Sequence, residues 1–382
     1  MDIAVIDAGI GGLATAIALQ QQGHKVHVFE TAAQWRPVGA GLWLAPNGQE
    51  VLQRLKPELL AQALAQGFVT REALIMTHTG QVLTRLEAEP LQRRYGHVPT
   101  LAIHRAALHQ ILHAALTPGT VHCGHRFRAF EARAERVQIH FEKAETVSAD
   151  LLIGADGLHS PVRRQLFGDL PLRYSGQTCW RGLSPAPLSE TWRHRSAEIW
   201  GPAAGLRVGF SPLADQRTYF YITALANAGE RAEISKAMLL RLLTDFPAEV
   251  QEMVAQTPVE QIMRHDLYDL PPLTSYHRGR VVLLGDAAHA TTPNLGQGAN
   301  QALESAWVLA DCLQQIADLE PALVRYEQVR IPKATQVVQR SWQINQMVNV
   351  SQPWLRHCRN FVVKHLPASL QLQQFDRLYH LV

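Results

Sequence analysis

Two stretches of the chain combine glycines with acidic residues in a pattern typical of nucleotide binding. Gly9 and Gly12 occupy the second and third glycine positions of a G-x-G-x-x-G pattern, and Gly11 lies between them. Such glycines let the backbone approach a pyrophosphate at the positive N-terminus of a helix, and an acid about 20 residues further on binds a ribose. Glu30 stands at that position. Asp7 replaces the first glycine, so a plain strand-turn-helix remains the alternative for this stretch.

Two later blocks of small residues carry further acids. Asp156 lies in residues 154–163, directly after an apolar strand; the alternative is a tight turn, because Asp-Gly pairs are common turn formers. The second block covers residues 284–300. Its Asp286 can accept hydrogen bonds from a sugar or ribityl hydroxyl, and Gly296 and Gly298 let amides at a helix N-terminus face an electron-rich group.

The elements that must position these residues can be predicted from hydrophobic periodicity. Residues 3–6, 13–22 and 25–29 form a strand, a helix and a strand, and residues 72–86 form two short strands. Residues 120–153 alternate as three strands, and residues 173–267 predict an antiparallel sheet with two helices between 233 and 254. Residues 281–284 form a buried strand and 298–315 a helix; the remainder is mainly helical. The fold class predicted is α/β.

Composition excludes several classes of protein. The chain has 382 residues, 47% of them hydrophobic, and its 36 Lys and Arg nearly balance 33 Asp and Glu, which argues against disorder and nucleic-acid binding. With no basic leader and no run of about 18 apolar residues, we expect a cytoplasmic protein without a membrane span. Residues 321–382 hold eight Arg or Lys against two acids. We interpret these basic residues as a solvated helical face. For the helices that carry them, plain packing is favoured; cover for the nucleotide-binding domain, a dimer surface and contact with anionic lipid are the alternatives.

Other chemistry finds little support in the sequence. Four scattered cysteines, Cys123, Cys179, Cys312 and Cys358, are expected to be reduced and mostly buried, and no metal site is predicted. Without a G-x-S-x-G motif, hydrolase chemistry is disfavoured. His289 either relays protons or is a packed histidine, and the second reading is at least as good.

The ordered set of blocks resembles the group A flavin-dependent monooxygenases of the para-hydroxybenzoate hydroxylase fold. The resemblance rests on the N-terminal glycines, Glu30, Arg105 and the two blocks around Asp156 and Asp286, and it spans nearly the whole chain. Residues 38–41, 46–48 and 179–182 place it nearest the salicylate hydroxylase, urate hydroxylase and zeaxanthin epoxidase branch. It implies a Rossmann-like FAD-binding domain with an inserted antiparallel-sheet substrate domain and C-terminal helices. The expected domains are 1–71 with 96–172 and 268–330 for FAD, 72–95 with 173–267 for substrate, and a helical segment 331–382.

The resemblance also implies roles for individual residues. FAD would be bound by Gly9, Gly11, Gly12, Glu30, Thr31, Arg105, Phe127, Asp156, Asp286, Gly296, Gln297 and Gly298, with Asp156 also linked to NAD(P)H. The substrate pocket would be lined by Trp43, Trp180, Tyr221, Pro293 and Asn294. Arg207 would hold an anionic or phenolate-like substrate, and Tyr219 would polarise or deprotonate a ring hydroxyl.

The activity implied is monooxygenation of a small aromatic or heteroaromatic substrate. NAD(P)H reduces FAD, O₂ adds to give a C4a-hydroperoxyflavin, and one oxygen passes to an electron-rich carbon. Partners would be the substrate and O₂, with a homodimer possible. Two alternatives stay open: a flavin-dependent epoxidase or polycyclic tailoring oxygenase, and a non-catalytic scaffold whose FAD binding Asp7 has weakened.

Overall fold

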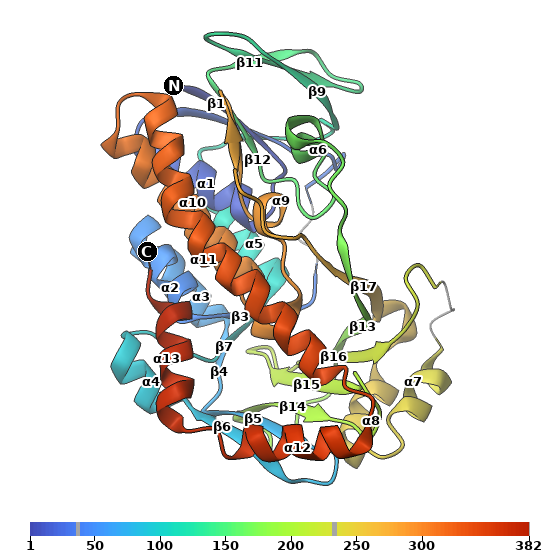
Figure 1. Ribbon diagram of the computed structural model, residues 1–382. Coiled ribbons are helices and arrows are strands. Elements are labelled where there is room, and N and C mark those ends of the chain that lie inside the picture. The colour runs from blue at the N-terminus through green and yellow to red at the C-terminus, as the bar shows by residue number, and fades with distance from the viewer. Residues whose placement is uncertain (36–38, 231–234, 382) are drawn as a thin grey trace.

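The computed structural model describes residues 1–35, 39–230 and 235–381, and its centre is a mainly parallel sheet (Figure 1). The strand order is β18 (His277–Arg278), β19 (Val281–Leu283), β12 (Leu151–Gly154), β1 (Asp2–Ile6), β2 (Lys25–Phe29) and β8 (Val121–His122). All neighbours are parallel except β18 and β19. Helix α1 (Ile10–Gln21) packs against α10 (Gly298–Gln315) and α5 (Arg105–Ala114).

Smaller elements surround this sheet. One three-stranded sheet contains β9 (Phe127–Ala132), β10 (Val137–Phe141) and β11 (Val147–Ala149). Another contains β3 (Gly41–Leu44), β7 (Leu101–His104) and β4 (Phe68–Val69), near α2 (Pro46–Leu55) and α3 (Pro57–Gln66). The remaining short helices are α6 (Pro161–Phe167), η1 (Val259–Gln261), α9 (Asp286–His289) and η2 (Pro293–Leu295).

A seven-stranded sheet forms the second layer. Its order is β17 (Met263–Asp269), β13 (Arg173–Ser184), β16 (Thr218–Leu225), β15 (Arg207–Pro212), β14 (Arg195–Trp200), β5 (Glu72–Thr77) and β6 (Val82–Glu87), followed by α4 (Ala88–Tyr95). Strand side chains alternate between the two faces. Val208 and Phe210 therefore pack in an apolar cluster with residues of α7 (Lys236–Leu242) and α8 (Ala248–Gln256), whereas Arg207 points to the opposite face.

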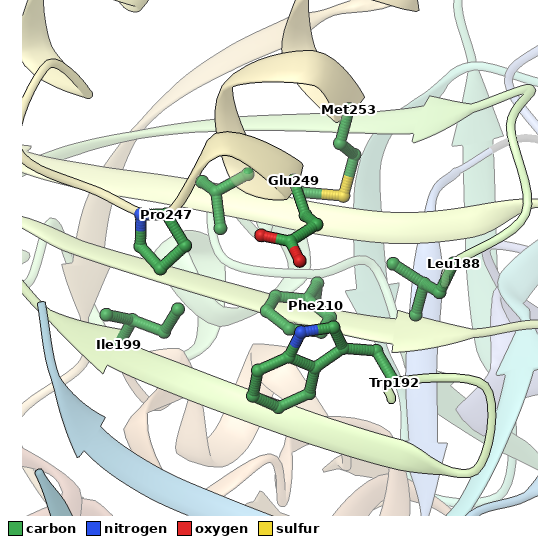
Figure 2. A pocket seen from close by; sticks show the side chains of 8 residues that line it. Leu188, Trp192, Ile199, Phe210, Pro247, Glu249 and Met253 are labelled. Atoms are coloured by element: carbon green, nitrogen blue, oxygen red, sulfur yellow. The ribbon is translucent and has the colours of Figure 1, made fainter. Parts of the chain in front are cut away.

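The face under α8 contains a small apolar hollow. Ile199 and Phe210 from the sheet face Pro247 and Met253 across it, and Trp192 closes one side (Figure 2). Its walls are almost entirely apolar, so it lacks the convergent polar groups of a substrate site. The polar face of the sheet is the other one.

Long helices complete the chain. Helix α11 (Leu319–Val348) runs diagonally across the molecule, and α12 (Pro353–Lys364) and α13 (Ala368–Tyr379) follow it (Figure 1). The expected boundary between residues 330 and 331 therefore falls inside one continuous helix. Among the described residues, no helix is both long and apolar enough to traverse a lipid bilayer.

The predicted fold class is confirmed, with two differences in detail. The pairing of β5 with β14 agrees with grouping residues 72–95 with 173–267, although the division into domains stays a prediction. Residues 120–153 form five strands rather than three, because short β8 and β12 belong to the central sheet and β9 to β11 form their own. All four cysteines are free; Cys179 and Cys312 are buried, but Cys358 is exposed.

Candidate active site

The turn between β1 and α1 has the backbone of a glycine-rich phosphate loop even though it begins with Asp7. Asp7 adopts φ 84°, the left-handed region, which aspartate tolerates better than most residues. Its carboxylate accepts a hydrogen bond of 2.9 Å from the Gly9 amide. A Cβ on Gly12 would lie 2.1 Å from the Asp7 carbonyl oxygen, so only glycine fits there. The departure seen in the sequence is therefore accommodated by the fold.

Electrostatics also reduce the conflict between Asp7 and a pyrophosphate. Burial and the nearby Glu30 carboxylate raise the pKa of Asp7 to about 7, while the Arg105 guanidinium acts in the opposite direction. Near neutral pH a large fraction of Asp7 is therefore protonated. A protonated carboxyl does not repel phosphate charge.

Glu30 ends β2 in the position expected for a ribose acid. Its two carboxylate oxygens accept hydrogen bonds from the Ala8 amide (3.1 Å) and the Ala32 amide (2.8 Å). The backbone of Glu30 pairs with residues 122 and 125, which brings the start of β9 and the buried Phe127 near the same end of the sheet. Thr31 is exposed beside it.

Arg105 and Asp286 are close enough to interact electrostatically. Arg105 is exposed and its side chain runs along Gly39, where a Cβ would meet the Arg105 Cδ at 2.7 Å. Asp286 is the first residue of α9 and is exposed to solvent. Desolvation by the surrounding protein raises its pKa, and the Arg105 cation acts in the opposite direction. Asp7, Arg105 and Asp286 thus converge from three segments.

The Gly296 to Gly298 segment leaves open space in front of the α10 N-terminus. Gly296 has a left-handed φ of 61°, and a Cβ at Gly296 or Gly298 would meet nothing within 4 Å. Gln297 between them is buried and accepts hydrogen bonds of 3.1 Å from Asn47 and from Gln301. This combination of a fixed backbone and an unobstructed front suits the approach of a flat ring to amides with a positive dipole.

A buried ion cluster holds α10 from behind. Glu304 forms ion pairs with Arg330 (2.5 Å) and Lys333 (2.7 Å), and also accepts from Asn47 (3.1 Å). Arg330 further donates to Gln301 at 2.7 Å. The interpretation of the basic C-terminal residues as a solvated face is wrong for Arg330 and Lys333, which are 0% and 6% exposed.

On the seven-stranded sheet, Glu198 is the centre of a closed polar network. Arg207 donates to both Glu198 oxygens at 3.3 and 3.4 Å, Trp200 Nε1 donates at 2.7 Å, and the Tyr221 hydroxyl also donates. These donors keep the pKa of Glu198 low although burial alone would raise it. Arg207 also donates to Asn294 at 2.9 Å, which ties the sheet to the η2 segment before Gly296.

Arg181 and Tyr219 form a second, open pair on the same face. Arg181 faces Tyr221 across the β13–β16 pairing and lies near Tyr219, whose pKa burial raises to about 12 against the opposing effect of the Arg181 cation. Within the described residues, no carboxylate pairs with Arg181 and its Nε has no hydrogen-bond partner. The Tyr219 ring packs against Gly41 of β3, where a Cβ would come within 2.4 Å.

The other expected site residues divide into three groups. Trp43 joins the site: its Nε1 donates to Ser211 of β15 at 2.8 Å. Asn294 is the Arg207 partner described above, and Pro293 next to it is exposed. Trp180 does not join them, because strand alternation points it into the apolar cluster on the far face. Trp180 is therefore not brought into the predicted pocket.

Asp156 and His289 have local structural partners. Asp156 accepts hydrogen bonds from Ser160 (2.5 Å) and the Val162 amide (3.0 Å) at the start of α6. His289 is buried within 2.8 Å of Ser305, and burial lowers its pKa to about 3, so it stays neutral. These contacts favour the packed-histidine reading of His289. Among the described residues no cluster has the composition of a metal site.

The residues present fit FAD. The turn after β1 has a position where only glycine fits, Glu30 ends β2, Arg105 acts electrostatically on both Asp7 and Asp286, and the space in front of the α10 N-terminus is unobstructed. These are the features that a dinucleotide site requires. Comparison with known proteins agrees: residues 1–341 match the family model described as an FAD binding domain. The chain belongs to this family.

Two curated relatives and one solved structure define the class further. Over 361 residues the chain is 34% identical to an aurachin C monooxygenase/isomerase of Stigmatella aurantiaca (93% of this chain, 92% of the relative). It is 37% identical over 344 residues to a 3-amino-4-hydroxybenzoate 2-monooxygenase of Streptomyces cremeus (89% and 85%). The structure of Klebsiella pneumoniae HpxO with FAD and uric acid aligns with a TM-score of 0.90 at 28% identity, covering 99% and 96%. The chain is an FAD-dependent monooxygenase that consumes NAD(P)H.

Sequence reasoning missed three features of the site. Glu198 alternates with apolar residues on β14 and so reads as a solvent-facing strand residue. Arg181 lies in residues 179–182, which support the resemblance, but the sequence alone indicates no role for it. Asn47 lies in the first turn of α2. Its hydrogen bonds to Gln297 and Glu304 join distant parts of the chain, so no local sequence pattern indicates them. The sequence does hold one signal for Arg181: on a strand it lies on the same face as Cys179 and on the opposite face from Trp180.

Proposed function

We propose that this chain hydroxylates a small, electron-rich aromatic or heteroaromatic ring, using FAD, NAD(P)H and O₂. Relatives support the substrate class: one is named for 3-amino-4-hydroxybenzoate, and HpxO was crystallised with uric acid. The site supports it as well, because polar groups and aromatic rings from both layers meet on one face of the seven-stranded sheet.

The contrast between the two arginines carries the proposal. Arg207 is buried and already paired with Glu198, so it has little capacity to bind a substrate anion. Among the described residues no carboxylate pairs with Arg181, which lies beside Tyr219 and Cys179. We assign the substrate's carbonyl, phenolic or enolate oxygen to Arg181 and Tyr219. Arg207 instead positions the segment before Gly296 through Asn294.

Each residue then has a limited task. A tyrosine with a pKa of about 12 keeps its proton at neutral pH, so Tyr219 orients and polarises the ring oxygen as a donor rather than removing its proton. Bound FAD, reduced by NAD(P)H, supplies the oxygen activation. The amides at Gly298 would face its electron-rich ring, while Trp43 and the β3 backbone cover the substrate and exclude water.

The test is substrate-dependent NAD(P)H oxidation measured together with hydrogen peroxide release. A panel of phenolic acids, purines and quinolone-like heteroaromatics is compared for the wild type, Arg181→Gln and Arg207→Gln. We expect a small ring to accelerate oxidation with little peroxide. Arg181→Gln should raise KM about tenfold or more at unchanged unfolding midpoint, whereas Arg207→Gln should lower the midpoint and release peroxide. Equal KM effects in both variants would contradict the assignment.

The same panel separates the alternatives. An epoxidase would respond only to alkenes and a polycyclic tailoring oxygenase only to larger fused polycyclic compounds, so both kinds of compound are added to the panel. A scaffold that binds no FAD would show no oxidation at all. The glycine-like backbone of Asp7 and its raised pKa support an intact FAD site rather than this scaffold.

A further inference from the structure

Helix α12 presents its apolar side chains to solvent. Trp354, Phe361 and Val362 are 64%, 65% and 61% exposed. They stand at positions i, i+7 and i+8, and Cys358 at i+4 is also exposed, so all four share one side of the helix. The helix lies along the outer edge of the molecule, beside β6 (Figure 1).

The opposite side of α12 faces the protein, where Val363 packs against the apolar cluster of Leu83, Trp200 and Val348. The Arg359 guanidinium stacks over the Trp200 ring at 4.4 Å, and Arg356 and Asn360 are partly buried on the same side. A surface helix of a water-soluble domain normally buries its apolar stripe and exposes its charges. Helix α12 buries Val363 but leaves Trp354, Phe361 and Val362 in solvent, so packing within this chain explains the inward side of the helix and not its exposed apolar side.

Helix α12 itself carries charge of one sign. Residues 328–375 contain no Asp or Glu, and α12 itself carries Arg356, Arg359 and Lys364. Lys364 is exposed at the end of the helix, and the exposed His357 and His365 flank the apolar face. Exposed apolar side chains next to a lysine, on a helix that carries no acid, match the composition of helices that lie in the interface of an anionic bilayer.

We propose that α12 docks this enzyme peripherally on an anionic phospholipid surface. Trp354, Phe361 and Val362 enter the headgroup region, while Lys364 stays at the phosphate level because its long stem lets the ammonium reach water. A second copy of the chain fits this face less well. A twofold interface sets the same patch against itself, which would bring the acid-free, cationic α12 of each copy together.

The experiment is co-sedimentation of the FAD-loaded full chain with vesicles. One set is pure phosphatidylcholine and the other contains roughly one-third phosphatidylglycerol. The variants are Trp354→Ala/Phe361→Ala, Lys364→Glu, and the control Leu64→Ala/Leu225→Ala, which removes two exposed apolar side chains elsewhere. NAD(P)H oxidation and light scattering on a sizing column are recorded for each protein.

We expect the wild type and the control to bind the anionic vesicles and to bind pure phosphatidylcholine far less. The partition coefficient should fall on the order of tenfold or more in Trp354→Ala/Phe361→Ala, and several-fold in Lys364→Glu. Equal binding by all four proteins, or no binding by the wild type, would overturn the proposal. A dimer that dissociates in Trp354→Ala/Phe361→Ala without vesicle binding would assign this face to a second copy.

Discussion

The guanidinium of Arg207 and the carboxylate of Glu198 pair on neighbouring strands of the seven-stranded sheet, at 3.3 and 3.4 Å. Both side chains are largely withdrawn from solvent, at 4% and 20% exposure. An ion pair in this setting fixes geometry more than it adds stability. Arg207 also donates to Asn294, so the ion pair fixes the position of the segment before Gly296.

Removing the charge of Glu198 should destabilise the fold. Glu198→Gln leaves Arg207 buried without a counter-ion, which costs on the order of 3 kcal/mol of unfolding free energy. Urea unfolding of the FAD-free protein measures this loss. The matched control is Glu190→Gln, which breaks the exposed pair with Arg193 and should change stability by less than about 1 kcal/mol. Similar losses in the two variants would contradict the burial of the network.

FAD affinity should depend on pH through Asp7. The folded pKa of about 7 lies above the usual value of 3.8, so the carboxyl keeps its proton until neutrality and becomes a repelling anion above it. The FAD dissociation constant should therefore rise as pH increases through about 7, approaching tenfold per pH unit at most. Flavin fluorescence quenching follows the titration.

Two substitutions separate the effect of the Asp7 charge on FAD binding from the effect of its backbone conformation. Asp7→Asn keeps a side chain that tolerates positive φ and can accept from Gly9, so it should flatten the pH dependence. Asp7→Gly should flatten it and also tighten binding. A variant that retained the wild-type slope would assign the titration to another group.

The contact between Gly41 and Tyr219 predicts a position that is sensitive to added side-chain volume. In Gly41→Ala the new Cβ would lie 2.4 Å from the Tyr219 ring, so β3 or β16 must shift. We expect stability to fall by about 1–3 kcal/mol and kcat/KM to fall about tenfold or more. Thermal unfolding and steady-state kinetics measure the two effects. In a Tyr219→Ala background the methyl group should be tolerated, and a full additive loss there would show that the contact is not responsible.

The cluster behind α10 should be among the most sensitive in the protein. Glu304→Gln leaves Arg330 and Lys333 buried without their carboxylate and should cost about 3–5 kcal/mol of unfolding free energy. Adding Lys333→Met should recover part of that loss, because one uncompensated cation is removed. Glu320→Gln, a change at a mostly exposed residue of the same helix as Arg330, is the control. Denaturant midpoints unaffected by Glu304→Gln would contradict a buried cluster.

Local patterns were sufficient to predict the strand-turn-helix framework of the FAD-binding fold, while the roles of single residues in binding FAD stay predictions. The turn after β1, Glu30 and the glycines before α10 are set by backbone requirements that act over a few residues, and these are visible in sequence. Contacts across layers were not visible. Nothing near Arg330 in the chain indicates that Glu304 neutralises it, so a solvated helical face was the natural interpretation.

The substrate face shows the same limit. Strand parity separates Arg181 from Trp180, but which face meets the flavin depends on how the sheet packs on β3. Arg207 was predicted to bind the substrate from its residue type and strand position. That prediction could not take account of Glu198, which pairs with Arg207 in the fold. The roles of Arg181, Tyr219 and Arg207 remain predictions for the experiments above.

The central claim is that one oxygen atom of O₂ enters a small aromatic or heteroaromatic ring. Mass spectrometry of the product formed under ¹⁸O₂ with FAD, NAD(P)H and the most active ring of the panel tests it most directly. The account predicts a hydroxylated product carrying one ¹⁸O atom, with NAD(P)H consumed in equal amount. An unchanged ring with all of the reducing equivalents recovered as hydrogen peroxide, for every compound in the panel, would contradict it.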